Sequence, residues 1–160
     1  GNVLQRLINN GEGAGYHRVP LIHEIFQQPL NLHVTATLAS ALQWARTDEL
    51  DPDPWRRTRI ADGPAFNAWI GDLASQGIVQ LLGSTFSDHM LPYFPEAFNR
   101  DNIELADEVL TEIYGRPPSS RVLWLPERLA DSATLRMVCS GSIEISSTKG
   151  PNASMTSSAS

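Results

Sequence analysis

Residues 78–82 read Ile78-Val79-Gln80-Leu81-Leu82, and residues 121–125 read Arg121-Val122-Leu123-Trp124-Leu125. Both are nearly continuous apolar runs, which are typical of strands buried on both faces of a sheet. A helical pattern separates them, beginning at Asp101 and ending at Gly115. Two strands with a helix between them need a crossover connection, and crossovers join parallel strands. The sequence therefore predicts an α/β fold of parallel strands with crossover helices.

The same alternation continues on the N-terminal and C-terminal sides of these stretches. We predict a short strand at Leu30–Thr35, helices at His17–Gln27, Thr37–Ala45, Asp62–Gln76 and Ser132–Val138, and a loop at Thr47–Pro54. Asp62 is the expected N-cap of its helix, and Gly77 and Gly115 are the expected helix stops. The expected apolar stripes are Val19, Ile22, Ile25 and Phe26 in the first helix, Ala65, Phe66, Trp69 and Leu73 in the third, and Ile103, Ala106, Val109, Leu110 and Ile113 in the helix from Asp101.

Composition and charge exclude several classes of protein. The chain has 160 residues with 12 Lys and Arg against 18 Asp and Glu, a net charge of −6. A negative chain is a poor ligand for nucleic acid or an anionic membrane, so we expect neither partner. The single cysteine excludes an internal disulfide framework and a cysteine-rich zinc site. No apolar run approaches the roughly 20 residues that span a bilayer. The first residues lack the pattern of a signal peptide, so we expect a cytoplasmic protein.

The two ends of the chain differ in composition from its centre. Residues 1–15 form an N-terminal segment with a Gly-rich loop at Asn9–Gly15, and this loop lacks the Gly-Lys-Ser/Thr of a phosphate-binding loop. Residues 16–138 form the expected folded domain. Residues 139–160 are of low complexity and rich in serine, so we expect a disordered tail, with Ser142–Ser146 as a candidate short strand.

Polar residues follow both apolar strands. Ser84 to His89 come after the first, and Glu127 and Arg128 come after the second. The carboxyl ends of parallel strands meet at one edge of a sheet, where ligands bind, so we expect His89 and Glu127 in one pocket. Glu127 as a turn cap paired with Arg128 is the competing interpretation. His89 and His33 are open to a purely structural role in the same way, and His23 is expected at the surface or in packing.

Three motifs of this sequence resemble those of one enzyme family. Trp124-Leu125-Pro126-Glu127-Arg128 resembles the Trp-Leu-x-Glu motif of glycoside hydrolase family 57. The stretch from Gly77 to Pro92 is similar to its Gly-x-Val-Glu-Leu-Leu … His-Pro-Ile-Leu-Pro segment, and Leu32–Leu38 is similar to its His-x-x-Gly-x-Leu segment. The family comprises amylases, 4-α-glucanotransferases, amylopullulanases and branching enzymes. The resemblance implies a partial (β/α)7-type barrel over about residues 17–138, with Glu127 as catalytic nucleophile.

The resemblance also implies a ligand. The partner is an α-glucan or maltooligosaccharide, cleaved with retention or transferred, and no cofactor or metal is expected. Trp124 and Phe86 offer flat apolar surfaces to sugar rings, although Trp124 is equally open to a core-filling role. His33, His89 and Arg128 complete the expected substrate-binding set, and Arg128 or His89 would favour the ionised form of Glu127.

The sequence departs from the family pattern in three respects. Gln80 stands where many members have Glu, and Gln28-Pro29 lacks the histidine of the opening His-Gln-Pro motif. No counterpart exists for the downstream Asp that acts as acid/base. Retaining cleavage requires two carboxyl groups roughly 5–5.5 Å apart. We therefore expect a truncated copy that is inactive alone. Whether its tail at 139–160 is a frameshift artefact is left open by the sequence.

Two further functions remain open. The chain is alternatively a non-catalytic carbohydrate-binding or structural remnant of such a barrel. A metal-dependent polysaccharide deacetylase-like protein is the third interpretation, with His33, Asp88 and His89 as the candidate ligands, although their spacing lacks the usual His-x3–5-His pattern. A serine hydrolase is disfavoured because Gly83-Ser84-Thr85 lacks the second glycine of a nucleophile elbow. An incomplete barrel leaves an apolar sheet edge unpaired, so we also expect self-association.

Overall fold

The computed structural model describes residue 8, residues 15–45 and residues 62–144. The helices in these ranges are α2 (Gly15–Phe26), α3 (Ala36–Trp44), α4 (Gly63–Ser75), α5 (Glu96–Tyr114) and α6 (Ser132–Glu144), with short 3-10 turns η1 (Leu91–Tyr93) and η2 (Pro126–Arg128). The strands are β1 (Leu30–Leu32), β2 (Val79–Gly83) and β3 (Ser119–Leu123). The loop predicted at Thr47–Pro54, most of the Gly-rich loop and residues 145–160 lie outside the described residues.

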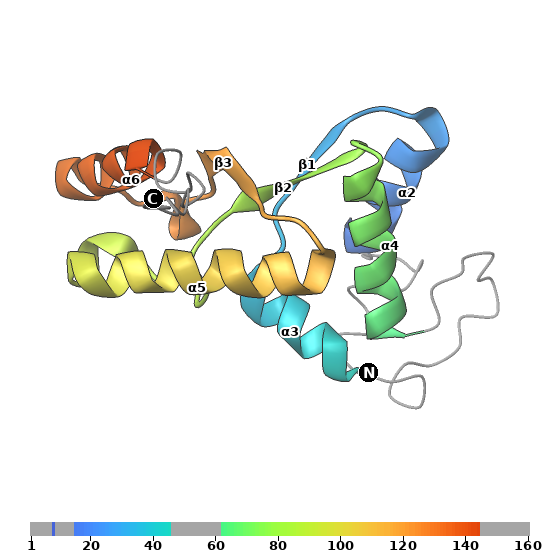
Figure 1. The fold of residues 1–160 in the computed structure, drawn as a ribbon, viewed down its shortest axis with the longest axis horizontal. Helices are drawn as coiled ribbons and strands as arrows, with labels where there is room; N and C mark the ends of the chain where they lie inside the picture. The colour runs from blue at the N-terminus through green and yellow to red at the C-terminus, as the bar shows by residue number, and fades with distance from the viewer. Residues whose placement is uncertain (1–7, 9–14, 46–61, 145–160) are drawn as a thin grey trace, which may run out of the picture.

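The three described strands form one parallel sheet in the order β1-β2-β3 (Figure 1). Leu30 pairs with Val79 and Leu32 with Leu81, and the pairing of β2 with β3 shifts register between Leu82 and Gly83. The parallel pairing confirms the predicted α/β class. The sheet is not closed into a barrel, because closure of a fully packed barrel takes about eight tilted strands and three strands twist without meeting.

The core lies between the sheet and a layer formed by α3, α4 and α5 (Figure 1). Val79 and Leu81 of β2 point into it, whereas Gln80 between them is exposed. Alternation along the strand therefore turns the residue at the family's Glu position away from the helices. The largest fully buried apolar side chains are Phe66, Ile70, Leu73, Leu42, Leu91 and Leu110, together with Ile8.

Both long helices end as predicted, and only α5 begins at a different residue from the one predicted. Gly77 and Gly115 have φ values of 77° and 74°, the left-handed conformation in which glycine ends helices. Asp62 caps α4, since its Oδ1 accepts a hydrogen bond of 2.9 Å from the backbone N–H of Ala65. By contrast, α5 begins at Glu96 and not at Asp101. Its added first turn is anchored by tertiary contacts of Asn99, described below.

Three predictions about faces and ends are corrected. The stripe of Val19, Ile22, Ile25 and Phe26 is largely exposed, and α2 instead buries His17 and Pro20. In α4, Ile70 is fully buried while Ala65 and Trp69 are only half-buried. The last helix continues to Glu144, so residues 142–144 belong to α6 and not to a strand. α6 lies beside the N-terminal half of α5, where Arg100 donates to Ser140.

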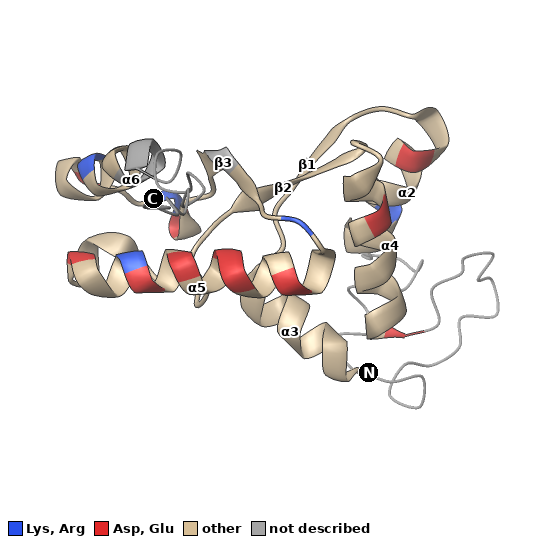
Figure 2. Cartoon of the chain, viewed as in Figure 1, with Lys and Arg blue, Asp and Glu red and all other residues tan. Residues whose placement is uncertain are grey.

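Acidic residues recur along the whole length of α5 (Figure 2). Most of them lie on the solvated side of the helix, opposite the core, whereas Asp107 is half-buried. In the part of the chain that the structure describes, no helix combines the length and hydropathy needed to cross a membrane.

Candidate functional site

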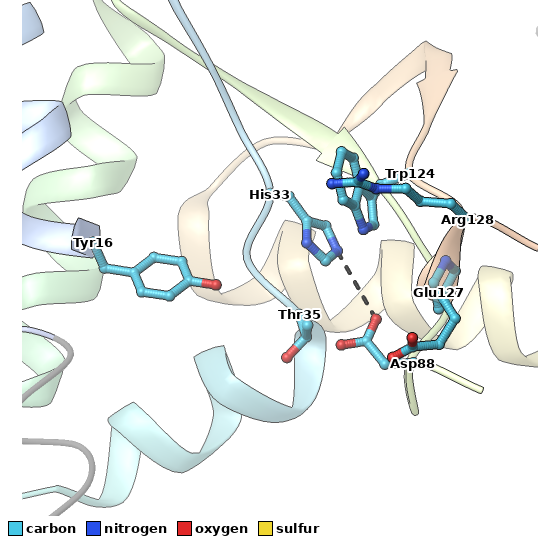
Figure 3. Close-up of a pocket in the computed structure, with 8 residues that line it drawn as sticks. Tyr16, His33, Thr35, Asp88, Trp124, Glu127 and Arg128 are labelled. Atoms are coloured by element: carbon cyan, nitrogen blue, oxygen red, sulfur yellow. Dashed lines mark ion pairs between the residues drawn. The ribbon is translucent and has the colours of Figure 1, made fainter. Parts of the chain in front are cut away.

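A pocket of about 570 Å³ opens beside the C-terminal ends of the three strands (Figure 3). The residues that line it are Tyr16, His33, Thr35, Asp88, Trp124, Pro126, Glu127 and Arg128. His33 and Thr35 follow β1, Asp88 follows β2, and the last four follow β3. Every described strand therefore contributes to the pocket at its carboxyl end, which is where open parallel sheets bind ligands.

Backbone and side-chain hydrogen bonds hold the ends of β2 and β3 together. The N–H of Trp124 donates to the carbonyl of Gly83 at 2.7 Å, and Ser84 Oγ donates to the carbonyl of Trp124 at 3.2 Å. The predicted adjacency of these two strand ends is confirmed. Because of it, residues that lie 40 positions apart in sequence face one pocket.

His33 and Asp88 face each other across the pocket wall, in a contact that is an ion pair when His33 is protonated. His33 Nε2 lies 4.0 Å from Asp88 Oδ1, and Ser84 Oγ donates to the same oxygen at 3.5 Å. Burial lowers the pKa of His33, and the charge of Asp88 opposes that shift. Burial raises the pKa of Asp88; His33, Ser84 and His89 oppose this, whereas the charge of Glu127 adds to it. The carboxyl groups of Asp88 and Glu127 are thus close enough to interact, as Figure 3 shows.

Trp124 is held between polar neighbours. Its ring stacks on the His33 imidazole with centroids 5.4 Å apart and planes 24° apart, and the Arg128 guanidinium lies 6.0 Å from the ring centroid. Stacking and cation–π contacts of this kind orient all three side chains. Trp124 is 39% exposed, so the core-filling interpretation of this residue is wrong.

The backbone of the pocket is unusual at three positions. Asp88, Glu127 and Arg128 have φ values of 51°, 54° and 53°, in the left-handed region that side chains other than glycine rarely adopt. Such conformations cost roughly 1–3 kcal/mol each and cluster at binding and active sites, where surrounding contacts hold them. All three residues with this strained backbone therefore line the pocket.

Two predicted site residues do not line the pocket. Phe86 is half-buried and packs against the core. The Nε2 atom of His89 lies 2.7 Å from Asn99 Oδ1, and its ring packs edge-on against Phe94 and Phe98. Buried Asn99 is itself fixed, because its Nδ2 donates to the carbonyls of Leu91 and Phe94. The predicted meeting of His89 and Glu127 in one pocket is therefore wrong.

Among the described residues, Glu127 makes no capping hydrogen bond, contrary to the competing interpretation. Asp131 caps α6, since its Oδ1 accepts a hydrogen bond of 2.7 Å from the N–H of Thr134. The contacts between acidic and basic side chains among the described residues are His33–Asp88 and Arg100–Glu96, so Glu127 is not paired with Arg128. Glu127 is exposed at the pocket edge.

Sequence reasoning placed His33, Trp124, Glu127 and Arg128 in the sugar-binding site, named Asp88 only as a candidate metal ligand, and missed Tyr16 and Thr35. A signal for Asp88 was present. When Leu91-Pro92 is matched to the Leu-Pro of the His-Pro-Ile-Leu-Pro stretch, Asp88 falls at its histidine position and His89 at its proline. Tyr16 gave no such signal, because α2 reaches the pocket only through the tertiary fold. Burial and the charge of Asp88 raise the pKa of Tyr16.

The candidate metal ligands His33, Asp88 and His89 do not form a metal-binding cluster. Within residues 15–45 and 62–144, no group of three or more His, Cys, Asp or Glu side chains is arranged to hold a metal ion. His33 and Asp88 face each other, but the Asn99 contact and the two phenylalanine rings engage His89. The site therefore does not support a deacetylase-type metal centre.

Comparison with solved structures finds a fold relative. The 4-alpha-glucanotransferase from Thermococcus litoralis matches with a TM-score of 0.61 at 16% identity. The match covers 79% of this chain and 17% of the glucanotransferase chain. No protein-family model matches the sequence, and no curated protein does. At this identity the likeness shows a shared fold.

Proposed function

We propose that this chain is a segment of a carbohydrate-active enzyme that binds α-glucan at the strand-end pocket and supplies Glu127 as the nucleophile for retaining hydrolysis or glucan transfer. The observation that carries the proposal is the position of Glu127. It follows β3 and shares a pocket with His33 and Asp88, which follow β1 and β2. The fold likeness to part of a glucanotransferase supports the same class of reaction.

The pocket suits a neutral sugar. Thr35, Asp88, Glu127 and Tyr16 present hydroxyl and carboxylate groups, which pair with sugar hydroxyls, and Trp124 adds partly exposed aromatic surface. In the proposed reaction the Glu127 carboxylate attacks the anomeric carbon and forms a glycosyl ester, while the glycosidic C–O bond breaks and its oxygen takes a proton from a second carboxyl group. Water or a glucan hydroxyl then displaces Glu127, and the proton it loses returns to that second group.

The 160-residue chain is expected to turn over little natural glucan. The family's acid/base Asp has no counterpart in these residues, and a glucosyl oxygen is a poor leaving group without a proton donor. A fluoride leaving group removes this requirement. A glucosyl fluoride that carries a second fluorine on its ring therefore tests the nucleophile in isolation, because C–F cleavage needs little acid assistance.

The experiment incubates the chain with that α-glucosyl fluoride and maps the adduct by peptide mass spectrometry. We expect one glycosyl ester at Glu127 and none in Glu127→Gln, which cannot attack. Isothermal titration with maltooligosaccharides measures binding in parallel, with cellooligosaccharides as control. An adduct on another residue contradicts the nucleophile assignment. Binding without any adduct supports the non-catalytic binding module instead, and absence of both binding and adduct contradicts the proposal.

A further inference from the structure

Asp88 is a pocket residue that the proposed reaction does not use. It leaves β2 through the segment 84–90, and Figure 3 shows its carboxylate beside that of Glu127 and facing His33. The side chain is 37% exposed on the pocket side. In the described part of the chain its carboxylate accepts one hydrogen bond, the long 3.5 Å contact from Ser84. An ionised carboxylate offers about four acceptor positions, so most of its capacity is unused.

The His33 imidazole faces the Asp88 carboxylate. Its Nε2 atom is buried and has no hydrogen-bond partner among the described residues, and Asp88 Oδ1 is the acidic oxygen facing it at 4.0 Å. The stack on Trp124 fixes the plane of the imidazole. Both side chains line the pocket, and the buried Nε2 atom of His33 faces the Asp88 carboxylate.

Two neighbouring carboxylates define the chemistry of the ligand. Ionised Asp88 and Glu127 repel each other, and this repulsion is relieved by hydrogen-bond donors placed between them. An anionic ligand would add to the repulsion. Adjacent hydroxyl groups of a neutral sugar donate to both oxygens of a carboxylate and carry no charge, and hydrogen bonds to charged acceptors are the stronger ones.

We propose that Asp88 binds the saccharide directly, by accepting hydrogen bonds from neighbouring hydroxyl groups of the glucosyl residue next to Glu127, with His33 as a positioning residue facing it. This inference rests on the proposed function, because it names a contact of the same ligand. It assigns glucan recognition to the segment after β2 and chemistry to the segment after β3.

The test is Asp88→Asn, measured by isothermal titration with maltooligosaccharides. Asparagine tolerates the left-handed backbone found at this position and keeps the side-chain shape, so the fold is retained. We expect the affinity to fall about tenfold or more. The matched control is Asp72→Asn on the exposed face of α4, which should bind as the unaltered chain does.

A pH series separates direct contact from a structural role. Sugar hydroxyls favour ionised Asp88, so affinity should rise with pH through the titration of this group and lose that rise in Asp88→Asn. His33, His89, Tyr16 and Glu127 also act on Asp88, and all of them remain in the variant. If Asp88→Asn has a lower melting temperature than the original chain, a second variant is used. Asp88→Glu keeps a carboxylate and should recover both the affinity and its pH dependence.

The outcomes distinguish this inference from the proposed function. Unchanged affinity and an unchanged pH profile in Asp88→Asn overturn the role of Asp88, while the adduct at Glu127 still stands. An Asp88→Glu variant that binds no better than Asp88→Asn also overturns it. Failure of the unaltered chain to bind any maltooligosaccharide overturns both.

Discussion

One backbone dihedral decides which polar side chain after β2 reaches the pocket. With φ at 51°, the chain at Asp88 sends the Asp88 carboxylate toward His33 while His89 turns to Asn99. Asn99 is buried and donates hydrogen bonds to two backbone carbonyls, so its own position is fixed and it holds His89 in place. At this scale the site depends on individual side chains whose partners are distant in sequence, and the strain at Asp88 is offset by those partners.

A buried carboxyl group on α5 makes stability depend on pH. Burial, aided by the charge of Glu104, raises the pKa of Asp107 to about 6, and its Oδ1 has no hydrogen-bond partner among the described residues. The folded state holds this proton more tightly than the unfolded state. The associated stability is therefore complete below pH 3.8 and is lost as the pH rises through about 6.

Asp107→Asn should remove that loss. We expect the variant to exceed the original chain by about 1–2 kcal/mol at pH 8, a figure reduced for partial solvent exposure, with no difference near pH 4. Urea unfolding at both pH values measures the difference, and groups common to both proteins cancel. A variant that is less stable at pH 8 would show that Asp107 has a stabilising partner.

Helices α3, α4 and α5 are joined by a buried polar link as well as by apolar packing. Asn67 of α4 donates to the carbonyl of Ala39 in α3 at 2.9 Å and accepts from Tyr114 Oη in α5 at 3.2 Å. Burial raises the pKa of Tyr114, so its hydroxyl remains a donor at all ordinary pH values. The amide fixes the three helices relative to one another, and hence the layer that supports the sheet.

Asn67→Ala should cost about 2–4 kcal/mol, because it removes both hydrogen bonds, leaves the buried Tyr114 hydroxyl without its acceptor and creates a small cavity. Tyr114→Phe removes only one of the two hydrogen bonds and should cost about 1 kcal/mol. Chemical denaturation followed by tryptophan fluorescence measures both. Equal losses in the two variants would mean that the Ala39 bond contributes nothing.

The close approach of α3 and α4 leaves no space at Gly63. A Cβ atom there would lie 2.0 Å from the carbonyl oxygen of Leu42, and a backbone oxygen cannot move aside cheaply. Gly63→Ala should destabilise the fold by about 1–3 kcal/mol. Gly15→Ala is the control, since nothing lies within 4 Å of its added Cβ. Melting temperatures of the two variants measure the contrast, and a melting temperature for Gly63→Ala as high as that for Gly15→Ala contradicts the packing argument.

As a whole, the described molecule is an open sheet with the α3, α4 and α5 layer packed against it and a pocket at its carboxyl edge. In the order β1-β2-β3, both outer strands have an edge that pairs with no other described strand. Val122 on β3 is 44% exposed. An exposed edge with apolar side chains is a template for pairing with another chain, so self-association remains our prediction at this scale.

Val122→Lys should reduce that association, because a charge on an edge strand opposes strand addition. Light scattering over a range of protein concentrations measures the apparent mass of the original chain and the variant. Gln76→Lys, at the exposed end of α4, adds the same charge away from the edge and should change nothing. A chain that stays monomeric at all concentrations contradicts the prediction.

The sequence by itself determined the α/β class, the parallel strands, both helix stops and four of the pocket residues. These features depend on local signals: apolar runs, glycine at left-handed positions, and the rule that parallel strands end at one edge. Glu127 and Trp124 were accessible in this way because they directly follow a strand that periodicity locates.

The tertiary structure decided the withdrawal of His89 from the pocket, the entry of Tyr16 into the pocket and the exposure of the apolar face of α2. Each depends on a partner far along the chain. Asn99 lies ten residues beyond His89 and withdraws it from the site, and α2 meets the pocket only after the sheet has formed. Periodicity reports which positions are apolar, but only packing sets which face is covered and which way a side chain leaves a strained turn.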